Sequence, residues 1–174
     1  MLHSKAADML TAAVEEYLEI AKRSAWDKEL NCFGYPATLL ILCVIEQIGQ
    51  LHASEVVQIP NEKGKIETRE VTRKNPWPIL NHSLFNMNLS LKHIQLVKEL
   101  VRNPLAHQVF LERGAVLIPD SAEPPEIKVI DKRLYIDVRG LQKKTSRAWD
   151  IIKEDRVLID NWSQNQWQLE NRNF

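Results

Sequence analysis

Residues 37–51 read ATLLILCVIEQIGQL, and this stretch decides the fold. It is apolar on nearly every side of a helical projection, which is typical of a helix buried at the centre of a protein. Gly34 and Pro36 mark its start, because proline is favoured near the first position of a helix. We therefore expect a central helix around which the other helices pack.

The segments on either side of this helix show helical periodicity with one polar face. In residues 4–25, Leu10, Val14 and Leu18 recur at helical spacing, opposite a charged side. A second such pattern begins at Leu141 and runs on past Trp149. Together these patterns predict an all-α bundle of about four to five helices, in a single domain that spans residues 1–174.

Two segments lack a helical period. Residues 52–78 contain clustered charge and three prolines, and they predict a loop or a short hairpin insertion that turns at residues 61–64. Residues 127–138, IKVIDKRLYIDV, contain two β-like runs on either side of Asp131 and Lys132. They predict a small β-hairpin before the last helix.

The composition restricts the class of protein. Lys and Arg together number 23, as do Asp and Glu, so no net charge draws the chain to nucleic acid or to anionic lipid, although a local basic face stays possible. Cys32 and Cys43 form no metal motif and favour a reducing compartment. The N-terminal residues lack a signal-peptide pattern, and the apolar run 37–45 is too short to cross a bilayer. We expect a cytoplasmic protein without a membrane segment.

Residues 101–108, VRNPLAHQ, interrupt a helical pattern that begins at Ser90. Proline disfavours helical geometry in the residue before it, so Asn103 is expected to cap a new helix that starts at Pro104. Arg102 would then lie at the start of that helix and His107 one turn inside it. We expect both side chains to face one cleft.

These residue types suit acid/base chemistry on a phosphate. Imidazole is the usual proton donor and acceptor near neutral pH. A guanidinium can grip a phosphate through two hydrogen bonds and stabilise developing charge, and Asn103 could orient either partner. The spacing by itself also fits a capped helix junction with a solvent-facing Arg102, and this alternative stays open.

The junction resembles the HEPN superfamily (higher eukaryotes and prokaryotes nucleotide-binding). Its domains are helical bundles with an arginine, usually a polar residue after it, and a histidine after four to six intervening positions. Arg102, Asn103 and His107 fit this motif. The stretch FGYPATLLILCVIEQIG, residues 33–49, is similar to the buried second helix of one uncharacterised bacterial branch, as is the order of junction, hairpin and last helix. The resemblance covers about residues 5–155.

The resemblance implies metal-independent RNA cleavage by a homodimer in which both Arg/His sets face one composite cleft. The RNA 2′-OH attacks the adjacent phosphate and leaves a cyclic phosphate and a 5′-OH. His107 would be the general acid or base, Arg102 would stabilise the phosphorane, and Asn103 would position a partner. Such a protein would act on single-stranded RNA in a defence or toxin system, with an antitoxin as a further candidate partner, and would need no cofactor. The alternatives are an inactive HEPN module that binds a nucleotide or a partner protein, and a purely structural dimerisation domain.

Other polar residues are weaker candidates. Glu46 interrupts the apolar helix and could orient His107 or Arg102, or could lie at the edge of the buried face. Three basic residues could contact an RNA backbone or be solvated charges: Lys143, Lys144 and Arg147. His82 and His93 lack the spacing of a helical metal pair, so no metal site is expected.

Overall fold

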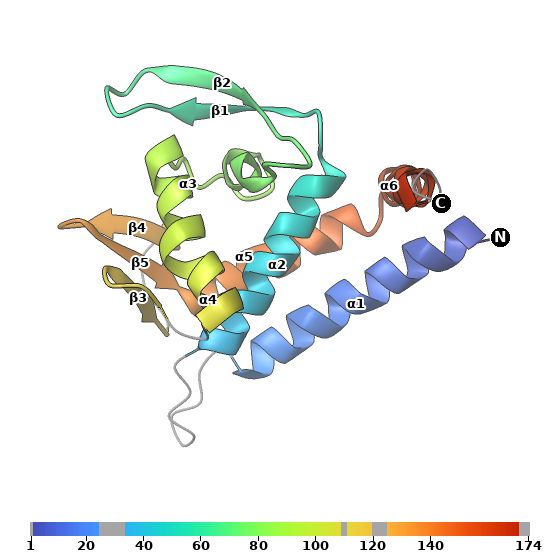
Figure 1. The fold of residues 1–174 in the computed structure, drawn as a ribbon, viewed down its shortest axis with the longest axis horizontal. Coiled ribbons are helices and arrows are strands. Elements are labelled where there is room, and N and C mark those ends of the chain that lie inside the picture. The colour runs from blue at the N-terminus through green and yellow to red at the C-terminus, as the bar shows by residue number, and fades with distance from the viewer. Residues whose placement is uncertain (1, 25–33, 109–110, 120–124, 171–174) are drawn as a thin grey trace.

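The computed structural model describes residues 2–24, 34–108, 111–119 and 125–170. Four long helices form one part of the molecule: α1 (Leu2–Ser24), α2 (Tyr35–Leu51), α5 (Val138–Ile152) and α6 (Arg156–Glu170). Figure 1 shows α2 running through the middle, with α1 and α6 on one side and a three-stranded sheet on the other. Helix α2 contacts α1, α5 and α6, so it is the central helix against which the other three long helices pack.

The prediction of a buried helix at residues 37–51 is confirmed. Ile41, Leu42, Ile45 and Ile48 are fully buried, and each contributes roughly 1.5–3 kcal/mol by leaving water. Gly34 precedes the helix with φ 71°, a left-handed conformation that glycine adopts without strain. No helix in the described ranges combines the length and the apolar character that crossing a membrane requires.

The all-α prediction is wrong, because the chain also forms two β-sheets. A two-stranded antiparallel sheet pairs β1 (Val56–Pro60) with β2 (Ile66–Glu70). A three-stranded sheet has the order β3-β5-β4, formed by β3 (Ala115–Ile118), β4 (Ile127–Ile130) and β5 (Arg133–Asp137). The fold is therefore mixed α and β.

The three-stranded sheet extends the hairpin expected at residues 127–138. Strand β5 pairs with β4 in antiparallel register and with β3 in parallel register. Leu134 and Ile136, on one face of β5, are fully buried, as period-two alternation requires. Strand β3 was missed because an apolar run of four residues does not distinguish a strand from a helix, and its partner follows only after a long connection.

Residues 52–78 contain the β1–β2 hairpin, one of the two structures that the sequence allowed. The Asn61 side chain closes the turn, since its Oδ1 accepts hydrogen bonds from the backbone N–H groups of Lys63 and Lys65, both at 2.9 Å. Val57 and Ile59 are buried on the face of β1 that meets the 3₁₀ helix η1 (Trp77–Asn81). The hairpin therefore covers η1 instead of forming a free loop (Figure 1).

The expected helix break at residues 103–104 is also wrong. Helix α3 (Leu91–Val97), the π-helical turn η2 (Lys98–Arg102) and α4 (Asn103–Gln108) follow one another without interruption. Asn103 has helical dihedral angles, φ −68° and ψ −47°, and its backbone N–H donates to the Lys98 carbonyl, five positions earlier. Asn103 is therefore inside the helix and is not its N-cap.

The π turn explains how the helix accommodates a proline. In an α-helix the ring of Pro104 would clash with the carbonyl of Leu100 and leave that carbonyl without its N–H donor. The wider turn makes room for the ring. The Leu100 carbonyl instead accepts a hydrogen bond from the backbone N–H of Glu112, at 3.2 Å.

Candidate functional site

Arg102, at the end of η2, is held by Glu46 from α2. Its Nε and Nη2 both donate to Glu46 Oε2, at 3.1 and 2.8 Å. Each side chain is about a quarter exposed, at 25%. Of the two partners considered for Glu46, the structure therefore pairs it with Arg102.

The ion pair leaves Arg102 with unused donors. A guanidinium carries five N–H groups, and the Glu46 carboxylate engages two of them. Within the described residues the other three have no hydrogen-bond acceptor. The group is therefore a fixed, partly exposed cation that can still bind an anion.

Cys43 lies one turn before Glu46 on α2, close enough for its ionisation to respond to both charges. Burial raises the pKa of this thiol, Arg102 opposes the rise and Glu46 adds to it. The thiol therefore stays protonated near neutral pH and is a poor nucleophile. Cys32 lies outside the described residues.

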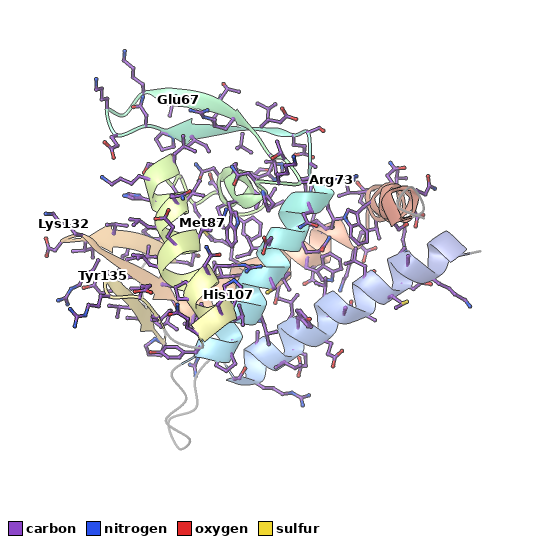
Figure 2. All side chains as sticks on the ribbon, viewed as in Figure 1. Glu67, Arg73, Met87, His107, Lys132 and Tyr135 are labelled. Atoms are coloured by element: carbon purple, nitrogen blue, oxygen red, sulfur yellow. The ribbon has the colours of Figure 1, made fainter. Side chains whose placement is uncertain are left out.

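His107 lies on α4 and is exposed (Figure 2). Among the described residues it makes no hydrogen bond or ion pair, and none joins it to Arg102. An α-helix advances about 100° per residue, so side chains five positions apart leave a continuous helix about 140° apart. The structure brings Arg102 together with Glu46, whereas His107 points to a different side of the helix.

Asn103 and the basic residues of α5 have different surroundings. Asn103 is partly buried and makes no side-chain hydrogen bond within the described ranges. Lys144 is bonded to Glu126, with 2.8 Å between Nζ and Oε2, so part of its charge is neutralised. Lys143 and Arg147 lie one turn apart on α5 and are exposed. Of the three RNA-contact candidates, these two have no ion-pair partner in the part of the chain that the structure describes.

A second polar cluster lies at the end of α2. His52 follows the last residue of α2, Glu55 precedes β1, and His82 follows η1. His52 Nδ1 donates to Glu55 Oε1 at 2.7 Å, and His82 Nε2 donates to Glu55 Oε2 at 2.9 Å. The ring centroids of the histidines are 5.1 Å apart. One carboxylate thus bridges two imidazoles.

The hydrogen bonds of this cluster indicate which nitrogen of each histidine carries the donated proton. His82 Nδ1 accepts a hydrogen bond from the backbone N–H of Leu84, at 3.3 Å, which places the proton on Nε2. Burial lowers the pKa of His82 and His52 lowers it further, while Glu55 opposes both. With the His52 proton on Nδ1, its Nε2 is a buried acceptor that has no partner among the described residues.

The sequence does not predict this cluster, because the spacing of His82 to His93 shows only that these two form no helical metal pair. His93 lies on α3, away from the cluster. The only local signal was the pair His52 and Glu55, three positions apart after a long apolar helix. The return of the chain through the β1–β2 hairpin and η1 brings His82 to them, and no spacing rule predicts that return.

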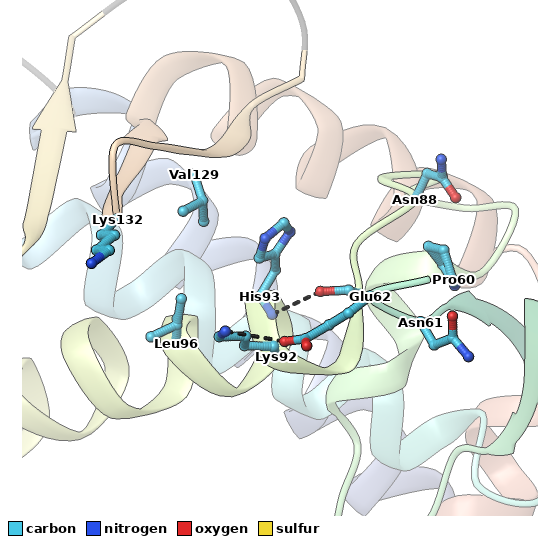
Figure 3. A pocket seen from close by; sticks show the side chains of 10 residues that line it. Pro60, Asn61, Glu62, Asn88, Lys92, His93, Leu96, Val129 and Lys132 are labelled. Atoms are coloured by element: carbon cyan, nitrogen blue, oxygen red, sulfur yellow. Dashed lines mark hydrogen bonds and ion pairs between the residues drawn. The ribbon is translucent and has the colours of Figure 1, made fainter. Parts of the chain in front are cut away.

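His93 borders a separate cavity of about 710 Å³. This cavity lies between the β1–β2 turn, the start of α3 and the β4–β5 turn (Figure 3). Glu62 and Lys92 form an exposed ion pair at its edge, at 3.0 Å. Neither Arg102 nor His107 lines it, so the cavity is not the cleft expected at the RNPLAH junction.

Comparisons with protein-family models, with curated proteins and with solved structures find no match to this chain. The HEPN resemblance therefore depends on the RNPLAH motif and on the order of the helices.

Proposed function

We propose that the protein is a metal-independent ribonuclease that uses Arg102 and His107. The observation that carries the proposal is the state of Arg102: Glu46 fixes its guanidinium, which is partly exposed, and none of the described residues accepts from the other three N–H donors. An arginine held in this way can bind a phosphate without first losing its side-chain freedom. His107, on the same helical segment, is exposed and unengaged by the described residues.

The chemistry needs one proton-transfer group and one fixed cation. His107 takes the proton from the 2′-OH, or gives one to the leaving 5′ oxygen. The bond between the 2′ oxygen and phosphorus forms as the bond between phosphorus and the 5′ oxygen breaks, which leaves a cyclic phosphate and a 5′-OH. Arg102 donates hydrogen bonds to the phosphorane oxygens, where charge develops.

The proposal includes a homodimer. Arg102 and His107 leave one helix about 140° apart, so one chain does not direct both at a single phosphate. A second copy could bring Arg102 of the partner subunit to the His107 side of the helix. Each active site would then combine residues of both subunits, as the resemblance to the HEPN superfamily implies.

The decisive experiment measures cleavage of single-stranded RNA in EDTA. We expect His107→Ala and Arg102→Ala each to lower the rate by about 10²-fold or more, with cyclic-phosphate ends on the wild-type products. His93→Ala and Arg73→Ala are matched controls for a lost histidine and a lost exposed arginine, and they should cleave like wild type. Intact RNA with wild-type protein, or an active His107→Ala variant, would contradict the proposal.

Two further measurements separate the remaining alternatives. Mixed Arg102→Ala and His107→Ala subunits should regain part of the activity if the site is composite, because some dimers then hold one complete set. If RNA stays intact but a nucleotide raises the melting temperature, the protein is an inactive nucleotide-binding module. If neither occurs, the structural dimerisation domain is the better description.

A further inference from the structure

The cluster of His52, Glu55 and His82 contains the donor set of a metal site. Each of the three residues offers one ligand atom, and these atoms all lie within 4.8 Å of one another. They come from three segments: the end of α2, the connection to β1 and the residue after η1. A cation bound there would join all three segments.

The separations suit an ion of the zinc class. Zinc binds imidazole nitrogen and carboxylate oxygen at about 2.0–2.2 Å, so neighbouring ligand atoms of a tetrahedral site lie about 3.4 Å apart. The two contacts of Glu55, at 2.7 and 2.9 Å, are slightly shorter than this, and the widest separation is at most 4.8 Å. Small side-chain rotations therefore suffice. Two nitrogen ligands favour a transition metal over magnesium or calcium.

The metal-free cluster leaves one imidazole nitrogen of His52 without a partner among the described residues. His52 is nine-tenths buried, with 10% of its side chain exposed. Its Nδ1 faces Glu55, and its Nε2 is buried without a partner among the described residues. Buried polar atoms in folded proteins nearly always have a hydrogen-bond partner. The unpartnered nitrogen is therefore a second indication that the metal-free cluster is incomplete.

Solvent reaches the cluster from the side of Glu55 and His82. Their side chains are 44% and 21% exposed, so an ion can enter, and water can fill the coordination position that three protein ligands leave open. Coordination through His82 Nε2 moves its proton to Nδ1 and breaks the long contact with the Leu84 N–H. The ion also replaces the hydrogen bonds that the two imidazoles donate to Glu55, and metal–ligand bonds to the same atoms take their place.

We propose that His52, Glu55 and His82 bind one divalent transition-metal ion of the zinc class. The ion ties the end of α2 to η1 and to the base of the β1–β2 hairpin. This site is separate from the proposed ribonuclease site, and it does not depend on that function. It also replaces the expectation, drawn from His82 and His93, that the chain has no metal ligands.

The test is a titration of the full chain with Co²⁺ and Zn²⁺ after dialysis against EDTA. We expect one equivalent of Co²⁺ to produce the intense visible absorption of a four-coordinate site, and Zn²⁺ to abolish it by displacement. His82→Gln and Glu55→Gln should each weaken Co²⁺ binding by at least about tenfold. His93→Gln, a matched loss of a nearby histidine, should bind like wild type.

The variants are designed so that folding does not decide the result. Glutamine at either position can still hydrogen-bond its neighbour, and the wild-type titration needs no variant. Wild-type protein without saturable Co²⁺ or Zn²⁺ binding would overturn the proposal. Equal binding by His82→Gln and wild type would also overturn it, because the ion would then lie elsewhere. Neither result bears on RNA cleavage, which is assayed in EDTA.

Discussion

Two polar connections, one from within helix α2 and one from the residue that follows it, reach later parts of the chain, and they differ in how they are assembled. One is the ion pair of Glu46 with Arg102, a residue that belongs to a compact sequence motif. The other is the cluster of His52, Glu55 and His82, whose members share no motif. Residues of a short motif can therefore be found from the sequence. A cluster formed at the ends of helices can be found only when it is known how later segments fold back against them.

The two connections also differ in charge. Arg102 is charged at every physiological pH, so the ion pair keeps its attraction. The histidine cluster depends instead on hydrogen bonds, because two imidazole N–H groups donate to one carboxylate. Gly49 lies one turn from Glu46 and one turn from His52, which makes it possible to disturb one connection and spare the other.

The largest effect on stability is expected for Gly49→Ala. A β-carbon at position 49 would overlap the carbonyl oxygen of Pro76, immediately before η1. Since backbone must move to relieve this contact, we expect a loss of about 1–3 kcal/mol in the free energy of unfolding. Urea unfolding measures it, with Gln50→Ala, at the next position of α2, as control.

The same variant tests whether the two connections are separate. A shift of η1 carries His82 away from His52, so Co²⁺ binding should weaken while RNA cleavage is kept at a temperature where the protein is folded. Gly49→Ala with wild-type stability and unchanged Co²⁺ binding would mean that α2 and η1 do not approach as closely as the structure shows.

A smaller effect on stability and a clear one on activity are expected for Glu46→Gln. Glutamine keeps the size of the side chain but removes the charge that orients Arg102. We expect RNA cleavage to fall by about tenfold, which corresponds to roughly 1.4 kcal/mol. The free energy of unfolding should fall by less than about 1 kcal/mol, because the pair is partly exposed.

The control for Glu46→Gln is a double variant. If Glu46 acts through Arg102, the substitution should have no further effect on cleavage in an Arg102→Ala background. Additive losses in the double variant would show that Glu46 acts on something other than Arg102.

A pair of alanine variants tests the corrected helix junction. Ser90 caps α3, because its Oγ accepts a hydrogen bond from the His93 N–H at 3.2 Å, so Ser90→Ala should cost about 1 kcal/mol. Asn103 lies inside the helix and caps nothing, so Asn103→Ala should change the free energy of unfolding by less than about 0.5 kcal/mol. Thermal unfolding compares the two. An equal loss of stability in both variants would indicate that Asn103 is an N-cap after all and that the helix breaks before Pro104.

The smallest effect is a pH dependence of the metal-free protein. The pKa of His82 is lowered in the folded state, so the unfolded chain binds a proton more readily. The contribution of His82 to stability is therefore complete above about pH 6.5 and is lost as the pH falls below that value toward the lower folded pKa. Unfolding in EDTA should show a steeper loss toward acid pH for wild type than for His82→Gln. Parallel curves would contradict the lowered pKa.

Local patterns predicted some parts of the fold well and others poorly. The apolar run of α2 and the alternation in residues 127–138 are strong signals because each reflects burial of a regular element. The prediction of a helix break at the junction failed because capping preferences consider only the local sequence around Asn103 and Pro104. In the folded chain a π turn accommodates the proline ring, and the carbonyl of Leu100 finds the N–H of Glu112 instead.

The candidate sites divide in the same way. The spacing together with the family resemblance selected Arg102 and His107, and the apolar context was enough to notice Glu46. Their arrangement was not predictable, because it depends on whether the helix breaks: a break would direct both side chains into one cleft, and a continuous helix separates them. The histidine cluster was beyond sequence rules altogether, since no pattern links His52 to His82.

By itself, the sequence determined which segment would be the buried helix, which residues could turn and which could exchange a proton or bind a phosphate. These are properties of side chains and of their spacing along one element. Only the tertiary structure decided that β3 joins β5, that the helix passes through Pro104, and that Glu55 bridges two histidines. Each of these depends on contacts between segments far apart in the chain, and such contacts form only when burial of the whole core brings them together.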